Sequence, residues 1–442
     1  MQTAPKKIVN AWAMYDWANS VYNLVITTTF FPIYFLAVTK KEEWANGESV
    51  PFLGQSFRNS SLYDYSLAVA YFLVAISYPV LTSIADSRGN KKSFLRFFCY
   101  MGAFGCSSLY FFDGSSLWIG IVGLIMGAMG YAGSLVFYNA YLPEIAYLPE
   151  IAAPADRDRI SAKGYSMGYI GSVLLQIIGF ALVVSMKGSE GEATRITFLL
   201  TGIWWFGFAQ ITFRGLPQVN RTELKKVNVL TDGFKEIGKV YREVKQMPVL
   251  KRFLRGFFFY SMGVQTVMLA ATQFGSKVLG LPDTNLIITV VLIQLVAIAG
   301  AILMSRLSSR YGNLRVLMGV VFFWMLICLA AFGTVQFKEA GGSAEMPFYG
   351  LAIAVGLVMG GIQSLSRSTY SKLMPETKDT ASYFTYYDFS EKVAIVLGLF
   401  AFGFIDERLG MKYSVLSLIV FFVIGMLWLY AAETRRRQAV AA

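Results

Sequence analysis

Several polar side chains stand inside long apolar runs of this sequence, where each one needs a partner or a function. Asp16, Asn19 and Asn23 are spaced i, i+3 and i+7, so on a helix they share one face. A carboxylate placed in hydrocarbon costs at least about 2.5–3.5 kcal/mol unless it is neutralised, paired or hydrated. This face therefore predicts contact with a polar solute or a proton. An interhelical hydrogen bond or a gate is the alternative for Asp16.

A second polar group lies near residue 365. Gln363 and Arg367 are one helical turn apart among serines, and the planar guanidinium of arginine suits a carboxylate or a phosphate. Three arrangements remain open for Arg367. It could form a gate with Asp16, hold the acid group of a solute, or pair with a carboxylate of its own half.

Asp388, Glu391 and Lys392 form a third polar group. Asp388 and Lys392 lie one helical turn apart and are expected to neutralise each other. Glu391 is then the surplus carboxylate and a candidate for carrying a proton.

The remaining candidates are neutral side chains, which can either bind a solute or join helices. Tyrosines also serve as anchors at the membrane surface. The full set expected to contact a solute is Asp16, Asn19, Tyr22, Asn23, Tyr138, Gln176, Gln265, Gln273, Gln294, Gln363 and Arg367. The set expected to couple protons or to form a gate is Asp16, Asp86, Asp388, Glu391 and Lys392.

The elements that carry these residues are apolar runs of about 20 residues, the length a helix needs to cross a bilayer core about 30 Å thick. With 55% hydrophobic and 15% charged residues, the chain is too apolar for a soluble globular protein. We predict an all-α membrane protein with twelve spans. They are Trp12–Val38, Leu62–Ala85, Phe94–Phe112, Leu117–Ala140, Gly164–Met186, Ile196–Leu216, Phe253–Leu279, Asn285–Ser305, Val316–Gln336, Phe348–Leu373, Tyr383–Ile405 and Tyr413–Ala432.

Lysine and arginine residues predict the orientation of these spans. Most of the 39 fall in loops on one side when the N terminus is placed inside the cell. Both termini are therefore expected to be cytoplasmic, in the plasma (inner) membrane or, alternatively, in a vacuolar or lysosomal membrane. The net charge of +12 then reflects this bias and attraction to anionic lipid, and we expect no nucleic-acid partner.

Several kinds of chemistry have no candidate residues. Histidine is absent, which removes the commonest general base and metal ligand. The three cysteines lie inside predicted spans without disulfide or metal-ligand spacing. No Gly-x4-Gly-Lys-Ser/Thr loop for a nucleotide occurs. We expect no metal, no cofactor and no enzyme activity, with a membrane-embedded carboxylate enzyme as a remote alternative.

Landmarks of the first half recur in the second half. Asp86–Lys92 and Ser309–Arg315 are similar glycine turns flanked by basic residues, and Tyr138–Glu144 resembles Tyr370–Glu376. Such repetition is typical of transporters in which two six-helix bundles enclose a solute near the membrane midplane.

The predicted domains follow from this repeat. Residues 1–216 and 252–442 are expected to form the two bundles, and residues 217–251 a cytoplasmic linker. An amphipathic helix is expected in the linker, because apolar side chains recur there at three- and four-residue steps. They are Phe234, Ile237, Tyr241 and Val244.

Several segments resemble a known family. The turn at Asp86 resembles the loop signature of the major facilitator superfamily, in which the aspartate takes part in a charge lock. Four segments together resemble the vacuole-effluxer branch, the autophagy-associated amino-acid effluxers and their bacterial relatives. They are Tyr15–Ser20, Tyr141–Ala146, Gly168–Gly171 and Gly360–Glu376. The sequence departs from that pattern by a tandem copy of Tyr-Leu-Pro-Glu-Ile-Ala at Tyr147–Ala152.

Residues and resemblance together predict a secondary active transporter that works by alternating access and is coupled to protons. The expected solute is small and polar or zwitterionic, an amino acid or small peptide first. An exporter of lipids or amphipathic drugs on the same fold is the alternative. The expected partners are the solute, the proton and membrane lipid, and the protein is expected to be a monomer.

Overall fold

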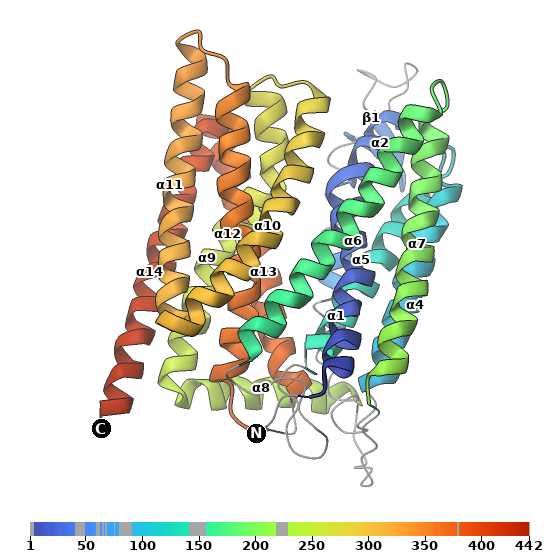
Figure 1. The fold of residues 1–442 in the computed structure, drawn as a ribbon. Coiled ribbons are helices and arrows are strands. Elements are labelled where there is room, and N and C mark those ends of the chain that lie inside the picture. Colours follow the sequence, from blue (N-terminus) through green and yellow to red (C-terminus); the bar gives the residue numbers. More distant parts are fainter. Residues whose placement is uncertain are drawn as a thin grey trace. The chain divides into compact units, whose positions relative to one another are not determined.

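The structure is a computed structural model that describes residues 4–39, 49–58, 62–63, 66, 69–74, 76–78, 91–139, 141, 156–217, 229–377 and 380–441 (Figure 1). Its helices are α1 (Lys6–Val21), η1 (Tyr22–Phe30), α2 (Phe31–Val38), α4 (Lys91–Ser108), η3 (Leu109–Phe111), α5 (Leu117–Asn139), α6 (Arg157–Ser185), α7 (Glu190–Gly215), α8 (Val229–Gln246), α9 (Pro248–Gln273), η4 (Phe274–Val278), α10 (Asp283–Tyr311), α11 (Asn313–Glu339), α12 (Glu345–Leu373), α13 (Thr380–Leu409) and α14 (Met411–Ala441).

A short hairpin is the exception to this helical architecture. Strands β1 (Ser49–Phe52) and β2 (Gln55–Arg58) pair antiparallel, with Ser49 opposite Arg58. Leu53 and Gly54 form its two-residue turn, and both have positive φ angles, as a type I′ turn requires.

Eight helices of the described chain are long and apolar enough to cross a membrane. They are Lys6–Val38, Leu117–Asn139, Arg157–Ser185, Glu190–Gly215, Ile288–Tyr311, Asn313–Glu339, Glu345–Leu373 and Met411–Ala439. Three further predicted spans coincide with α4, α9 and α13, and the second predicted span is described only in part. The predicted all-α architecture is confirmed.

The described residues form two compact units. The N-terminal unit comprises those within Pro5–Tyr141 and Ile170–Phe234. The C-terminal unit comprises Ala4 and those within Leu142–Tyr169 and Lys235–Ala442. Helix α6 contributes to both, because its first turns, up to Tyr169, belong to the C-terminal unit.

Close helix packing in the N-terminal unit depends on glycines. Helix α5 packs against α4, and a Cβ on Gly130 would lie 2.3 Å from the Cα of Gly102. A Cβ on Gly105 would likewise lie 2.7 Å from the backbone nitrogen of Gly127. No side chain larger than hydrogen fits between these backbones, so the glycines act in packing.

The C-terminal unit is built on four helix pairs, α10 with α12, α9 with α14, α11 with α14, and α9 with α13. Glycine again permits the closest approach, since a Cβ on Gly300 or Gly360 would lie 2.1 Å from a carbonyl oxygen of the facing helix. Helix α9 packs against both α12 and α13, and these three helices carry the polar residues of the unit's pocket.

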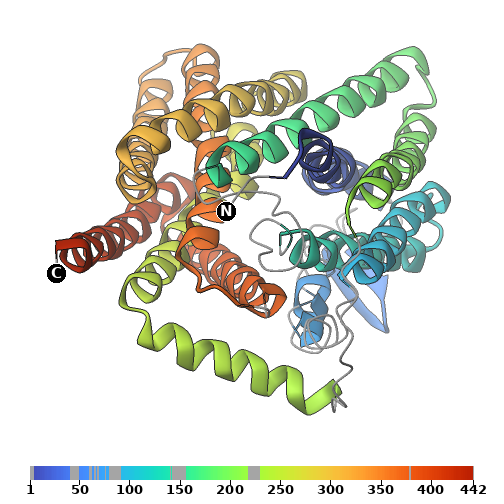
Figure 2. The same cartoon turned by 60° about the horizontal axis from the view of Figure 1, so that its bottom comes forward.

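Helix α8, the yellow-green helix at the lower edge of Figure 2, is the amphipathic helix that the linker sequence predicts. Val240 and Val244 are its buried side chains. Tyr241, expected on the apolar face, is instead exposed, and the ammonium of Lys245 lies 4.5 Å from its ring centroid. Glu243 accepts a hydrogen bond from the Tyr383 hydroxyl of α13 at 2.6 Å, which fixes α8 to the unit.

Candidate functional site

Asp16 lies in an aromatic enclosure within the N-terminal unit. Its side chain is buried, and the hydroxyl of Tyr138 on α5 donates a hydrogen bond to Asp16 Oδ2 at 2.8 Å. The Tyr138 ring stacks on Trp12 with centroids 4.5 Å apart, and Trp12 Nε1 donates to the Tyr138 carbonyl oxygen. The structure thus brings together Asp16 and Tyr138, two residues selected from the sequence.

The neighbouring candidates on α1 and η1 differ in their hydrogen bonding. Asn19 is completely buried, and neither of its amide atoms has a hydrogen-bond partner in the described part of the chain. Tyr22 is also buried, but its hydroxyl donates to the Leu124 carbonyl oxygen at 3.2 Å. Asn23 is half-buried. Asn19 therefore keeps unused donors and acceptors, whereas Tyr22 has a partner on α5.

The helix that follows Asn19 is wound as a π-helix over nine residues, η1. The Leu24 carbonyl oxygen accepts hydrogen bonds from Gln176 Nε2 at 2.7 Å, from Thr28 Oγ1 at 2.9 Å and from Thr29 Oγ1 at 2.8 Å. Gln176 thus joins α6 to η1, the interhelical alternative for this residue. π-Helical turns are frequent at functional sites, and no sequence pattern indicated this one.

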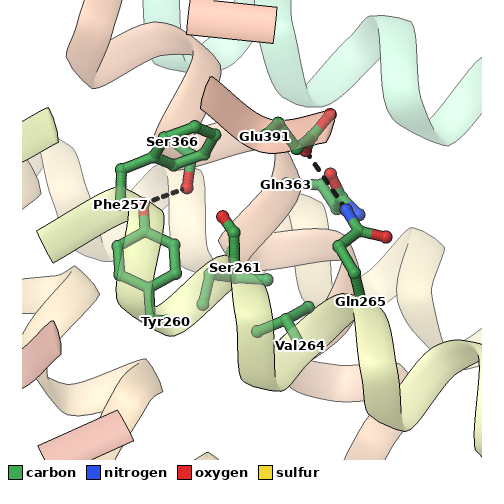
Figure 3. Close-up of a pocket in the computed structure, with 9 residues that line it drawn as sticks. Phe257, Tyr260, Ser261, Val264, Gln265, Gln363, Ser366 and Glu391 are labelled. Atoms are coloured by element: carbon green, nitrogen blue, oxygen red, sulfur yellow. Dashed lines mark hydrogen bonds between the residues drawn. The ribbon is translucent and has the colours of Figure 1, made fainter. Parts of the chain in front are cut away.

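A pocket with an empty volume of about 200 Å³ lies in the C-terminal unit between α9, α12 and α13 (Figure 3). Its walls combine aromatic, aliphatic and polar side chains. They are Phe257, Tyr260, Ser261, Val264, Gln265, Ile362, Gln363, Ser366 and Glu391. Three sequence-selected residues, Gln265, Gln363 and Glu391, therefore line one cavity.

Two hydrogen bonds order the pocket wall. The hydroxyls of Tyr260 and Ser366 lie 2.6 Å apart, and Gln265 Nε2 donates to Glu391 Oε1 at 3.1 Å (Figure 3). Gln363 Nε2 has a thioether as its partner, the Met268 sulfur at 3.7 Å. Because a thioether is a weak acceptor, a polar ligand could take over this amide.

The charged residues of α13 lie beside this pocket. Lys392 Nζ is 3.1 Å from Glu391 Oε2, so Lys392 pairs with its neighbour in the chain. The mutual neutralisation of Asp388 and Lys392 that the sequence predicts stays a prediction. In the structure Asp388 is buried, and its Oδ2 has no hydrogen-bond partner among the described residues. The long lysine side chain can fold back to an adjacent carboxylate, a possibility that helical spacing alone does not show.

Arg367 is buried against the first turns of α6, all within the C-terminal unit. Its Nε donates to Ser161 Oγ and its Nη2 to the Ser161 carbonyl oxygen, both at 2.9 Å. Its guanidinium carbon lies 4.2 Å from the centroid of the Tyr165 ring. These contacts bond Arg367 to α6, and the three arrangements that the sequence leaves open for its guanidinium stay predictions.

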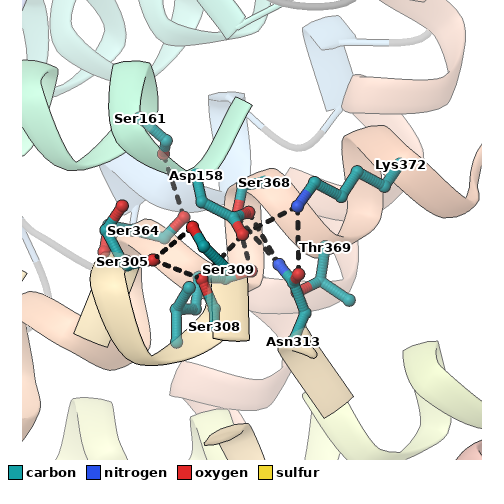
Figure 4. A network of polar contacts seen from close by, with 11 residues as sticks. Asp158, Ser161, Ser305, Ser308, Ser309, Asn313, Ser364, Ser368, Thr369 and Lys372 are labelled. Atoms are coloured by element: carbon teal, nitrogen blue, oxygen red, sulfur yellow. Dashed lines mark hydrogen bonds and ion pairs between the residues drawn. The ribbon is translucent and has the colours of Figure 1, made fainter. Parts of the chain in front are cut away.

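A polar network beside Arg367 centres on Asp158 of α6 (Figure 4). Ser308 Oγ donates to Asp158 Oδ2 at 2.6 Å, and Asn313 Nδ2 donates to Asp158 Oδ1 at 2.7 Å. Lys372 Nζ lies 2.7 Å from Asp158 Oδ2 and 3.0 Å from Asn313 Oδ1. Arg157 Nη1 also donates to the Ser371 carbonyl oxygen at 2.6 Å. The start of α6 is thereby bonded to α10, α11 and α12.

Sequence reasoning did not select Asp158. Its partner Asn313 lies in the second copy of the repeated turn, Ser309–Arg315, which has no carboxylate where the first copy has Asp86. A missing charge in one repeat could have prompted a search for a carboxylate supplied by another segment.

The three remaining candidates are Gln294, Gln273 and Asp86. Gln294 is buried in α10. Gln273 ends α9, and its side chain is outside the described set. Asp86 lies outside the described residues, as do most of the tandem Tyr-Leu-Pro-Glu-Ile-Ala copies. The charge lock expected of Asp86 therefore stays a prediction.

Solved structures with this fold are transporters. The human organic anion transporter MFSD10 matches with a TM-score of 0.73 at 11% identity, over 96% of this chain and 100% of that chain. The fucose:proton symporter FucP of E. coli matches with a TM-score of 0.65 at 12% identity, over 96% and 97% of the two chains. The twelve-helix major facilitator fold predicted from the sequence is confirmed.

Sequence comparisons identify a narrower group. The MFS-type transporter YxiO of Bacillus subtilis is 30% identical over 426 residues, which cover 94% of this chain and 92% of that protein. Autophagy-related protein 22-2 of Aspergillus oryzae is 24% identical, over 92% and 80% of the two chains. The family described as "Vacuole effluxer Atg22 like" matches residues 4–442. This chain is thus a transporter and not an enzyme, and it belongs to the Atg22-like vacuole effluxer family of the major facilitator superfamily.

Proposed function

We propose that the transported solute is a small zwitterionic organic molecule, an amino acid or small peptide, and that its transport is coupled to protons. The observation that carries the proposal is the half-buried Glu391–Lys392 ion pair beside a polar pocket of the C-terminal unit. Partial desolvation of an ion pair costs free energy, so a pair next to a cavity supports a use beyond stability.

A zwitterion fits this pair by charge exchange. Its ammonium group can bind the Glu391 carboxylate while its carboxylate binds the Lys392 ammonium. Both protein charges then stay compensated with and without solute, so binding leaves no protein charge of this pair without a partner. Gln265, bonded to Glu391, holds that carboxylate in place, and Gln363 can exchange the Met268 sulfur for a better acceptor on the solute.

The polarity of the pocket also bears on the alternative solutes. Most of the side chains that line it carry polar groups, whereas sites for drug-sized ligands are lined predominantly by hydrophobic side chains. Export of lipids or amphipathic drugs is therefore the less favoured function. It would be supported by binding of such compounds in the experiment described below.

Proton coupling is assigned to Asp16. This buried carboxylate has a hydroxyl partner in Tyr138, which can donate to an ionised carboxylate or accept from a protonated one. The similar solved structures include a protein named as a fucose:proton symporter, which agrees with proton coupling on this fold. Asp388 is the second candidate for the proton, since its Oδ2 is buried without a hydrogen-bond partner in the described set.

Alternating access is proposed to move residues 1–216 and 252–442 as two bundles joined by residues 217–251. Both termini are cytoplasmic in this proposal. The membrane is the plasma membrane, or alternatively a vacuolar membrane as the family description suggests. The contacts of α6 with Asn313, Arg367 and Lys372 would then hold one state. Release of α6 would free the Arg367 guanidinium for an anionic group of the solute.

A thermal-shift screen of the purified protein tests the proposed solute class, because a ligand that binds the folded form raises its apparent stability. Amino acids and dipeptides are compared with sugars, nucleosides and amphipathic drugs. We expect stabilisation by amino acids or dipeptides in the wild type and its loss in Glu391→Gln. Glu339→Gln is the matched control, because Glu339 forms an exposed ion pair with Lys412. Stabilisation only by sugars, nucleosides or amphipathic compounds would reject the proposal.

A further inference from the structure

The buried carboxylate of Glu433 on α14 pairs with three arginines in the C-terminal unit. Arg315 Nε lies 2.9 Å from Glu433 Oε1, Arg436 Nε 2.8 Å from Oε2, and Arg437 Nε 3.0 Å from Oε1. The Glu433 side chain is only 3% exposed. One carboxylate therefore fixes the positions of three guanidinium groups, which we call the Glu433 cluster.

The Glu433 cluster carries more positive charge than its carboxylate neutralises. Three arginines on one glutamate leave a surplus of two positive charges. The side chains of Arg315, Arg436 and Arg437 are 48%, 43% and 60% exposed, so the guanidinium groups remain accessible while one edge of each is held. Arginine recognises phosphate through the planar fork of its guanidinium.

The cluster lies where two membrane helices leave their apolar runs. Arg315 is in the first turn of α11, immediately before Val316, and Arg436 and Arg437 follow the apolar run of α14. The Trp428 ring of α14 has the Arg255 guanidinium 4.5 Å from its centroid, and Tyr430 is exposed. Aromatic and basic residues of this kind mark the lipid headgroup level.

The N-terminal end of α11 adds a positive electrostatic potential that favours an anion near the Glu433 cluster. Gly312 precedes the helix with φ +87°, and Arg436 Nη2 lies 3.5 Å from where its Cβ would stand. The N-terminal end of a helix carries a partial positive charge that attracts anions. Arg436 therefore places its guanidinium beside this helix end.

From these observations we propose that the Glu433 cluster binds the phosphate group of an anionic phospholipid. The buried carboxylate preorganises the arginines, the surplus charge attracts the phosphodiester, and the position at the membrane boundary supplies the lipid. Glu433 is a positioning residue in this site and does not touch the lipid.

A comparison of two arginines on the same helix, two residues apart, tests the site. The purified full-length protein is titrated with short-chain phosphatidylglycerol, phosphatidylcholine or inorganic phosphate, and binding is followed by native mass spectrometry. Arg437→Gln should weaken phosphatidylglycerol binding about fivefold, the effect of about 1 kcal/mol per basic residue. Arg435→Gln is the matched control, because Arg435 is bonded to Gln438. It should change binding less than twofold.

Removal of the carboxylate gives a second, independent test. Glu433→Gln raises the net charge, so diffuse attraction would tighten lipid binding, whereas loss of a preorganised array should weaken it. Equal weakening by Arg435→Gln and Arg437→Gln, or tighter binding by Glu433→Gln, would overturn the proposal. Inorganic phosphate that binds as tightly as phosphatidylglycerol would overturn the assignment to a lipid. If Glu433→Gln does not fold, the two arginine variants decide the question alone.

Discussion

The two units treat their intramembrane charges differently. In the N-terminal unit Asp16 is enclosed by Trp12 and Tyr138 and is held by a neutral hydroxyl. In the C-terminal unit Glu391 and Lys392 pair beside a cavity, with amides and hydroxyls around them. The Tyr138 hydroxyl can donate to an ionised Asp16 carboxylate or accept from a protonated one. A charge pair next to a cavity can instead exchange its partners for those of a zwitterion.

This difference suggests a division of labour, with proton handling in the N-terminal unit and solute binding in the C-terminal unit. Each of the following predictions tests that assignment of roles to the two units.

The largest effect is expected from Glu391→Gln. Loss of a charge-assisted hydrogen bond to the solute ammonium should weaken solute binding about 10- to 100-fold. The measurement is the dissociation constant of the amino acid or dipeptide found in the screen. An unchanged affinity, as expected for the control Glu339→Gln, would remove Glu391 from the binding site.

Asp158→Asn should lower stability more than it lowers solute affinity. Asp158 is nearly fully buried and bonded to Ser308, Asn313 and Lys372. Its neutralisation should therefore cost about 2 kcal/mol of unfolding free energy. Thermal unfolding compares it with Asp156→Asn, since Asp156 pairs with Arg159 in an exposed ion pair. Equal midpoints in the two variants would mean that the network does not hold α6.

Asp16→Asn should lower proton-driven accumulation of the solute without changing solute affinity. The Tyr138 hydroxyl can still donate to the amide oxygen, so the fold and the solute affinity should be kept. Solute accumulation in vesicles under a gradient of one pH unit should fall by about tenfold, the free energy carried by one coupled proton. Solute exchange without a gradient should continue. Full accumulation by this variant would reassign the proton, with Asp388→Asn as the next variant to test.

Gln363→Leu should give the smallest effect on binding. Its amide has a weak thioether partner in the empty pocket, so its expected contribution is one neutral hydrogen bond, about 1 kcal/mol or roughly fivefold in affinity. Gln294→Leu, at a buried position of α10 away from the pocket lining, is the comparison. A larger loss of affinity at Gln294 than at Gln363 would place the solute elsewhere.

Much of the fold was predictable from the sequence, because apolar runs long enough for a bilayer have few alternative structures. The polar residues of the pocket, Gln265, Gln363 and Glu391, were visible for the same reason, since they interrupt such runs. Ser261 and Tyr260 were not, because serine and tyrosine also occur at ordinary helix contacts. The sequence alone does not show which residues far apart in the chain contact each other in the fold.

Two features show that limit. Asp158 finds Asn313 and Lys372 only after α6 has packed against α10 and α12. The Leu24 carbonyl oxygen of the π-helix η1 accepts a hydrogen bond from Gln176, which is 152 residues away in the chain.

The most direct test of solute binding by the Glu391–Lys392 pair compares an amino acid or dipeptide with its N-acetylated derivative. Acetylation removes the ammonium charge and should weaken binding to the wild-type protein by tenfold or more. In Glu391→Gln the same acetylation should have little further effect, because the carboxylate that recognises the ammonium is gone. If acetylation weakens binding to both proteins equally, the ammonium is recognised elsewhere and the C-terminal pocket is not its binding site.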